Sequence, residues 1–148
     1  MLDRGGKGPL PVREELGRLF IEWGRREPAK WADADKVYNT LLLRKDDFPP
    51  WLARKMQLAS LRGSYPEARR WYEKLRLAKE KFIEPEAHGD FVAMLLDRYE
   101  NQYAPNPLRE PRRGPAPGMA DDQLWLVKTL DRTGEASYQK DRHYVPNY

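Results

Sequence analysis

The side chains best suited to acid–base or metal chemistry are few and lie far apart in this sequence. His88 and His143 stand in separate segments, and we interpret both as surface or packing residues. Asp46 and Asp47 form a carboxylate pair, but they follow two basic residues in a turn, whereas general acid–base catalysis needs a pocket. The chain has no cysteine, which excludes disulfides and cysteine-based zinc sites. No glycine-rich loop follows a strand pattern, so a nucleotide site has no support. We therefore expect no catalytic residue, no cofactor, no metal site and no small-molecule substrate.

The densest positive charge is the cluster Arg109, Arg112 and Arg113. These side chains could contact phosphates, as the extended basic tails of ribosomal proteins do, or an acidic patch on another protein. We favour protein contact, because aromatic residues flank the cluster and lysine is absent from it. The whole chain has 27 basic and 23 acidic residues, a net charge of +4, which is too balanced to require a nucleic-acid partner.

Helices must position these residues, and the clearest helical pattern lies between Asn39 and Leu75. Leu52, Met56 and Ala59 stand one turn apart, which predicts a helix here. Pro50 suits the first turn of that helix, because its missing N–H costs nothing there. Gly63 then ends the helix, since glycine adopts a left-handed cap freely.

A second helix is predicted directly after this glycine turn, which gives an antiparallel helical hairpin. Ser64 and Glu67 have the spacing of a capping box. The following apolar positions fall on one face, and basic and acidic residues cover the other. We interpret Trp71 and Tyr72 as core residues. The apolar face consists of Ala68, Trp71, Tyr72, Leu75, Ala78 and Phe82.

Three further helices complete a predicted helical domain over residues 12–103, preceded by a flexible Gly/Pro-rich arm over residues 1–11. One helix should run from Val12 to Arg26, one from about Trp31 to Leu43, and one should begin near Pro85. The sequence thus predicts an all-α fold, a short stack of antiparallel helix pairs. On the first helix the predicted buried side is Leu16, Leu19, Phe20 and Trp23.

Residues 104–148 are predicted to form an extended Pro-rich tail that orders only against partners. Its one expected helix is short, from Asp121 to Leu130, with Leu124, Val127 and Leu130 on one side. Aromatic residues with a polar tip suit protein interfaces. The candidate partner-interface residues are Arg109, Arg112, Arg113, Trp125, Tyr138, Tyr144 and Tyr148.

The central hairpin also has the spacing of a tetratricopeptide repeat, a 34-residue helical hairpin motif. The matching residues are Gly63, Tyr65, Glu67, Ala68 and Tyr72. No second copy appears 34 residues away, and true arrays need about three repeats. We therefore interpret the chain as a degenerate stack of helical pairs with a tetratricopeptide-like superhelix.

The same region resembles subunit Va of mitochondrial cytochrome c oxidase. The resemblance covers roughly Arg18 to Tyr103 and lies in helix lengths, turn positions and a few identities. It implies an accessory subunit of respiratory complex IV without haem, copper or a membrane span, peripheral on the matrix side of the inner membrane. The tail after Tyr103 and the absence of an Arg- and Ser-rich presequence depart from that family. The quoted residues are Trp31 to Lys36, Asn39-Thr40-Leu41, Asp46 to Pro50, Ala59, Gly63-Ser64 and Ala68 to Lys74.

The sequence therefore predicts a non-catalytic accessory subunit that stabilises a large mitochondrial complex, most simply the oxidase, by protein–protein contacts. No apolar run approaches the roughly 20 residues of a membrane span, so membrane contact would come only through partner subunits. Two alternatives stay open: a mitochondrial ribosomal protein that contacts rRNA through its basic tail, and a free-standing helical-repeat adaptor.

Overall fold

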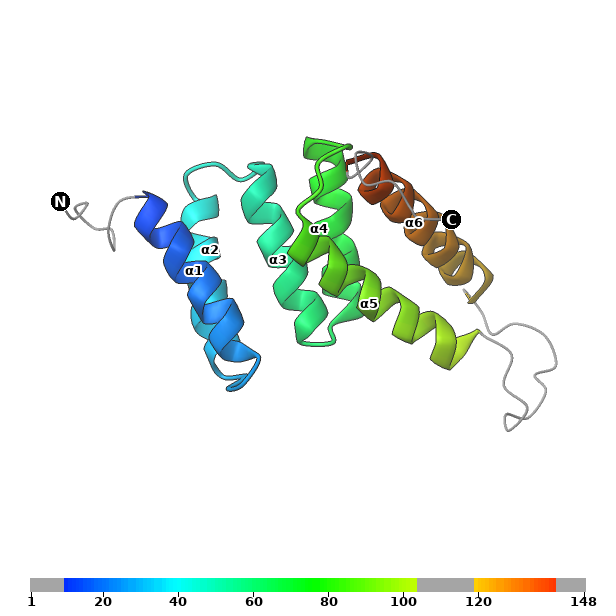
Figure 1. Ribbon diagram of the computed structural model, residues 1–148, viewed down its shortest axis with the longest axis horizontal. Helices are drawn as coiled ribbons and strands as arrows, with labels where there is room; N and C mark the ends of the chain where they lie inside the picture. Colours follow the sequence, from blue (N-terminus) through cyan, green and yellow to red (C-terminus); the bar gives the residue numbers. More distant parts are fainter. Residues whose placement is uncertain (1–9, 104–118, 141–148) are drawn as a thin grey trace, which may run out of the picture.

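The computed structural model describes residues 10–103 and 119–140, and within these ranges the chain is entirely helical apart from its turns (Figure 1). This confirms the predicted all-α class. Near the last helix, side chains are described from residue 121 to residue 134. The helices are α1 (Leu10–Gly24), α2 (Lys30–Leu42), α3 (Pro49–Leu61), α4 (Tyr65–Ala78), α5 (Pro85–Gln102) and α6 (Met119–Lys140).

The helices form a row in which sequence neighbours pack together. α1 lies against α2, and α3 lies against α4, each pair joined by a short turn and running in opposite directions (Figure 1). α3 also contacts α2 and α5, and α6 lies on α5. As a result, α1 and α6 stand at opposite ends of the molecule (Figure 1).

α3 is the central helix, and every residue from Trp51 to Ser60 except Arg54 is buried. One side of it, including Leu52 and Met56, packs into a core shared with α4, α5 and α6. Trp51 and Leu58 pack into a second core, shared with α1 and α2. A helix that is buried on all sides must satisfy its polar side chains within the protein.

Two polar residues of α3 meet this requirement through neighbouring helices. Lys55 forms an ion pair with Asp35 of α2. Gln57 is fully buried, and its Nε2 donates to Asp90 Oδ2 of α5 at 2.9 Å. Its Oε1 accepts from Nη1 of Arg54 at 2.9 Å. These bonds fix α3 relative to α2 and α5, because a buried polar group left without a partner is costly.

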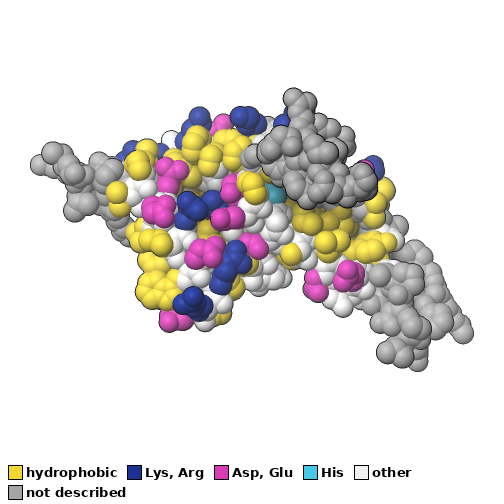
Figure 2. All heavy atoms as spheres, in the orientation of Figure 1, with side chains coloured by type: hydrophobic (Ala, Val, Ile, Leu, Met, Phe, Trp, Pro, Cys, Tyr) yellow, Lys and Arg dark blue, Asp and Glu magenta, His cyan; other side chains and the backbone are white. Residues whose placement is uncertain are grey.

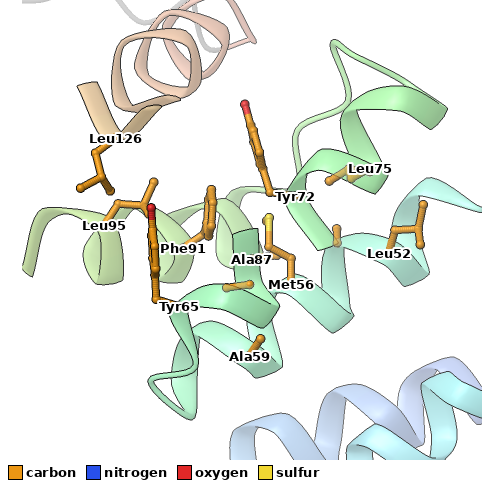
Figure 3. Packing of buried hydrophobic residues seen from close by; sticks show 12 residues of the cluster. Leu52, Met56, Ala59, Tyr65, Tyr72, Leu75, Ala87, Phe91, Leu95 and Leu126 are labelled. Carbon is orange, nitrogen blue, oxygen red and sulfur yellow. The ribbon is translucent and has the colours of Figure 1, made fainter. Parts of the chain in front are cut away.

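The larger core is centred on aromatic stacking between α4 and α5 (Figure 3). The rings of Tyr72 and Phe91 are stacked with centroids 4.9 Å apart. Tyr72 is therefore core, as predicted. Trp71 is only half-buried, with Nζ of Lys55 and of Lys74 above its ring at 5.2 and 5.3 Å. Trp71, which was also interpreted as core, packs against this core from its rim, because α4 turns this position toward the edge.

The turn between α3 and α4 follows the predicted glycine geometry but lacks the predicted cap. Gly63 has φ +74°, the left-handed conformation. Its N–H donates to the Ser60 carbonyl and the Ser64 N–H donates to the Ala59 carbonyl, the two bonds of a Schellman motif. The Ser64 side chain makes no capping hydrogen bond, so the expected capping box with Glu67 does not form.

α1 packs mainly with a face beside the one predicted, although Phe20 of the predicted side also packs against the second core. It buries Arg13, Gly17, Ile21 and Gly24, while Leu19 is 55% exposed. The reason is the close approach of the α2 side chains. A Cβ at Gly17 would lie 2.6 Å from Cζ of Tyr38, and a Cβ at Gly24 would overlap the indole of Trp31. The glycines therefore admit two aromatic rings that a bulkier helix face would exclude.

The C-terminal region contains a longer helix than the one predicted for the extended tail. α6 has 22 residues, about twice the length expected. It packs against the domain, with Leu126, Thr129 and Thr133 almost fully buried. At the other end, α1 begins at Leu10, inside the segment predicted as an arm. The helical structure thus extends past both predicted boundaries, because packing stabilises helices that are marginal alone.

We expect Gly17→Ala to lower the free energy of unfolding by about 1 to 2 kcal/mol, because the added methyl group overlaps the buried ring of Tyr38. Gly89→Ala is the matched control. Gly89 is exposed in α5, and a Cβ there meets no atom within 4 Å, so this variant should be neutral or gain up to about 1 kcal/mol of helix propensity. Urea unfolding of both variants is the measurement. If the two variants had the same free energy of unfolding, the glycine face would not set the α1–α2 distance.

Candidate protein-binding surfaces

Trp125, a predicted partner-interface residue, is engaged within the chain. Its Nε1 donates to Oε1 of Glu73 at 2.9 Å. The indole stands edge-on to the rings of Tyr65, Tyr72 and Phe91, with centroids 5.9 to 6.4 Å apart. Aromatic pairs in this orientation are favourable beyond their buried area. Trp125 therefore anchors α6 on α4 and α5, where the sequence had suggested an anchor for another protein.

Asp122 is the most densely bonded side chain of this junction. It accepts from the hydroxyls of Tyr65 at 2.5 Å and Tyr103 at 2.6 Å. Nε of Arg98 and Nη1 of Arg69 lie 3.3 and 3.4 Å from its two oxygens. One carboxylate thus joins α6 to α4, to α5 and to the residue that follows α5. Hydrogen bonds to a charged group are stronger than neutral ones.

This environment shifts the pKa of both the acid and its phenol partner. Burial by itself would raise the pKa of Asp122, but hydrogen bonds from Tyr103 and Tyr65, with the charge of Arg98, outweigh burial and hold the pKa below its ordinary value. Burial and the bond to Asp122 raise the pKa of the Tyr65 phenol. Asp122 therefore stays ionised and the Tyr65 hydroxyl stays a hydrogen-bond donor, which suits a structural role rather than proton transfer. We call Asp122 with its partners Tyr65, Tyr103, Arg69 and Arg98 the clasp.

We expect Asp122→Ala to lower the free energy of opening of α6 by about 2 kcal/mol, because two hydroxyls and two guanidinium groups lose a shared acceptor. Amide hydrogen exchange should show lower protection in α6 and unchanged protection in α3. Asp121→Ala is the control. Asp121 is exposed, and it shares with Asp122 only the position in the first turn of α6, near the positive end of the helix dipole. If both variants behave alike, the effect belongs to the helix dipole and not to the clasp.

The clasp also predicts an acid dependence of stability. Because folding lowers the pKa of Asp122 from its ordinary 3.8, the charged carboxylate stabilises the fold above that value. The contribution is lost as pH falls through the folded pKa. We expect the stability difference between wild type and Asp122→Asn to stay constant near neutral pH and to shrink as the pH falls below 3.8. A pH-independent difference in urea unfolding would contradict this assignment.

The surfaces best suited to another protein are the outer faces of the two end helices. On α1, Val12, Leu19 and Trp23 are 52%, 55% and 46% exposed. On α6, Leu124 and Val127 are 52% and 47% exposed. The apolar side predicted for this helix consisted of these two residues and Leu130, and Leu130 is half-buried. Figure 2 shows hydrophobic side chains over α1 beside a mixed row of acidic and basic ones. Apolar side chains gathered on a surface mark contact sites more often than scattered ones do.

The remaining polar clusters are occupied by contacts within the chain. A cleft of about 100 Å³ between α1, α3 and α5 contains Arg18, Arg54 and Glu86, and the two arginines lie near Glu86 at 3.9 and 3.4 Å. His88 is buried at the start of α5, where its Nδ1 accepts from the Glu84 N–H at 3.1 Å. Asp46 lies exposed in a turn. None of these arrangements presents an acid and a base toward an open site.

Most predicted interface residues lie outside the described residues: Arg109, Arg112, Arg113, Tyr144 and Tyr148. Tyr138 lies within α6, where only the backbone is described. The sequence reasoning missed the clasp of Asp122, because the bonds come from residues 19 to 57 positions away. It also missed the outward face of α1. Gly17 and Gly24 are seven positions apart, two helical turns, and this spacing could have indicated the buried side.

Comparisons with protein-family models, curated proteins and solved structures found no match for this chain. Within residues 10–103 and 119–140, no group of three or more histidine or acidic side chains is placed to hold a metal ion. None of the described helices is long and apolar enough to cross a membrane.

Proposed function

We propose that this protein is a non-catalytic accessory subunit that docks between neighbours in a large protein assembly. The observation that carries the proposal is the pair of exposed apolar faces at opposite ends of one row of helices, Leu19 and Trp23 on α1 and Leu124 and Val127 on α6. The end helices of a free-standing helical stack need polar outer faces for solubility. Apolar faces at both ends fit a block that two other surfaces cover.

Such a subunit acts by stabilising the assembled state of the complex. A protein that binds only the folded and assembled state stabilises that state by mass action. The rigid connection between the two ends makes this effective, because α3 joins both cores and its buried Gln57 and Lys55 fix the neighbouring helices. Little conformational freedom then has to be lost on docking.

We propose the mitochondrial cytochrome c oxidase as the assembly, with the subunit peripheral on the matrix side of the inner membrane. The support is the resemblance of Arg18 to Tyr103 to subunit Va, a family of stacked helix pairs. The packing of α3 against both α2 and α5 also fits a short tetratricopeptide-like superhelix, in which each helix pair contacts the next.

The test is native gel separation of mitochondrial membranes, with mass spectrometry of the band that contains the chain. We expect co-migration with the oxidase, and reduced incorporation of Leu19→Asp and of Leu124→Asp by about tenfold or more, since a charge cannot be buried unpaired. Leu77→Asp is the matched control, because Leu77 is 85% exposed and belongs to α4, which is not one of the two end helices.

Three outcomes would overturn the proposal in different ways. Migration of the chain as a monomer would favour a free-standing adaptor. Recovery with ribosomal subunits, with binding to rRNA that falls steeply as salt rises, would favour the ribosomal alternative. Equal incorporation of all three aspartate variants would show that the end faces do not dock.

A further inference from the structure

The outward side of α1 is an apolar stripe with an open groove along it. Val12, Leu19 and Trp23 follow one another at spacings of seven and four, which places them on one side of the helix. Phe20 lies beneath this stripe, because it packs against the second core and stacks on Trp23 with ring centroids 6.1 Å apart. The groove has a volume of about 670 Å³, and Leu16, Leu19 and Trp23 are among the residues that line it. A groove along a helix suits the apolar face of a second, amphipathic helix.

Two exposed glutamates border the apolar stripe. Glu15 lies four residues before Leu19 and Glu22 three residues after it, so both are its neighbours on the helix surface. The side chains of Glu15 and Glu22 are 61% and 57% exposed. Arg18 directly precedes Leu19, and successive residues are rotated by about 100° around a helix, so it points further from the stripe. Nη2 of Arg18 lies 3.9 Å from Glu86 of α5, in the cleft between α1, α3 and α5.

This edge and the adjoining cleft contain more acids than bases, a mixed row of charges that is visible beside the apolar side chains (Figure 2). Together with the groups bonded to the cleft residues, there are five acids and three bases, a net charge of −2. The whole chain has a net charge of +4, so this region is opposite in sign to the protein. The acids are Glu15, Glu22, Glu84, Glu86 and Asp90, and the bases are Arg18, Arg25 and Arg54.

The positive charges near the stripe lie at its other end. Arg26 follows α1 in the turn to α2 and is exposed at the end of the groove. Nζ of Lys30 lies 4.1 Å above the ring of Trp23 and 3.9 Å from Asp33, so Lys30 is engaged within the chain. A cationic partner is therefore attracted to the part of the stripe next to the two glutamates, and the Trp23 end offers it apolar contact.

We propose that the α1 face binds a basic amphipathic helix of a neighbouring subunit. The apolar side chains of that helix cover Leu19 and Trp23, and lysines or arginines about two turns apart pair with Glu15 and Glu22. The inference rests on the proposed function, since it names the chemistry of the neighbour at one of the two docking ends. Exposed ion pairs contribute little affinity each. The apolar contact therefore supplies most of the binding, and the charges select the partner.

The test uses the full purified chain and two synthetic helical peptides, each of about five turns. Both peptides have the same leucine face, which is bordered by lysines in one and by glutamates in the other. Fluorescence anisotropy of the labelled peptides at low salt measures binding. We expect the lysine peptide to bind about fivefold more tightly, through two exposed ion pairs. Attraction to the net charge of +4 alone would favour the glutamate peptide, so the sign of the preference isolates the local effect.

Variants of the chain assign this preference to individual side chains. Glu15→Gln combined with Glu22→Gln should abolish the preference for the lysine peptide. The matched control is Glu80→Gln combined with Asp121→Asn, which removes two exposed acids outside α1 and should leave the preference unchanged. Leu19→Asn should weaken both peptides by about tenfold, because a polar side chain then lies in the apolar contact. Circular dichroism checks that every variant is folded.

Equal binding of the two peptides, or tighter binding of the glutamate peptide, would overturn the basic partner. Sedimentation that shows self-association of the wild-type chain, abolished by Leu19→Asn, would also overturn it, because a second copy would then occupy the face. These results are separable from the proposed function. A chain without the lysine preference that still co-migrates with a large complex contradicts only the chemistry of the partner. A chain that prefers the lysine peptide but joins no complex contradicts the accessory-subunit role.

Discussion

The burial of α3 is the constraint on which the rest of the structure depends. This helix separates two cores and faces neighbours on nearly every side, so its polar side chains must find partners on other helices. Lys55 reaches Asp35 of α2, and Gln57 reaches Asp90 of α5. Asp90 in turn accepts from Arg25, at the end of α1, at 2.8 Å. One buried helix therefore sets the positions of the elements on both sides.

The two ends of the row are attached to this centre by different chemistry. α1 is held by close packing, since Gly17 and Gly24 let aromatic rings of α2 approach its backbone. α6 is held by a charged clasp, with Asp122 bonded to two phenols, and by the edge-on packing of Trp125. In both cases the strongest contacts are made by the inner face. The apolar residues of the outer faces are then left exposed.

This division accounts for the charged side chains at the helix junctions of residues 10–103 and 119–140. Acids and bases are abundant, but those at the helix junctions bond to one another. The lowered pKa of Asp122 and the raised pKa of the Tyr65 phenol both stabilise the resting protonation states. Groups held in this way maintain the shape of the protein, which is what the proposed accessory-subunit role requires.

The sequence by itself determined the helices and most of their limits. Proline at the start of α3, left-handed Gly63 and the apolar periodicity of α3 and α4 act within a few residues, so local pattern was sufficient. The tertiary structure alone decided which face of α1 lies inward, because that depends on Tyr38 and Trp31 fitting against glycines. It also decided that α6 joins the domain, since Tyr65 and Tyr103 come from distant positions. Periodicity shows that a helix has two unlike faces, but only the neighbouring helices determine which face is buried.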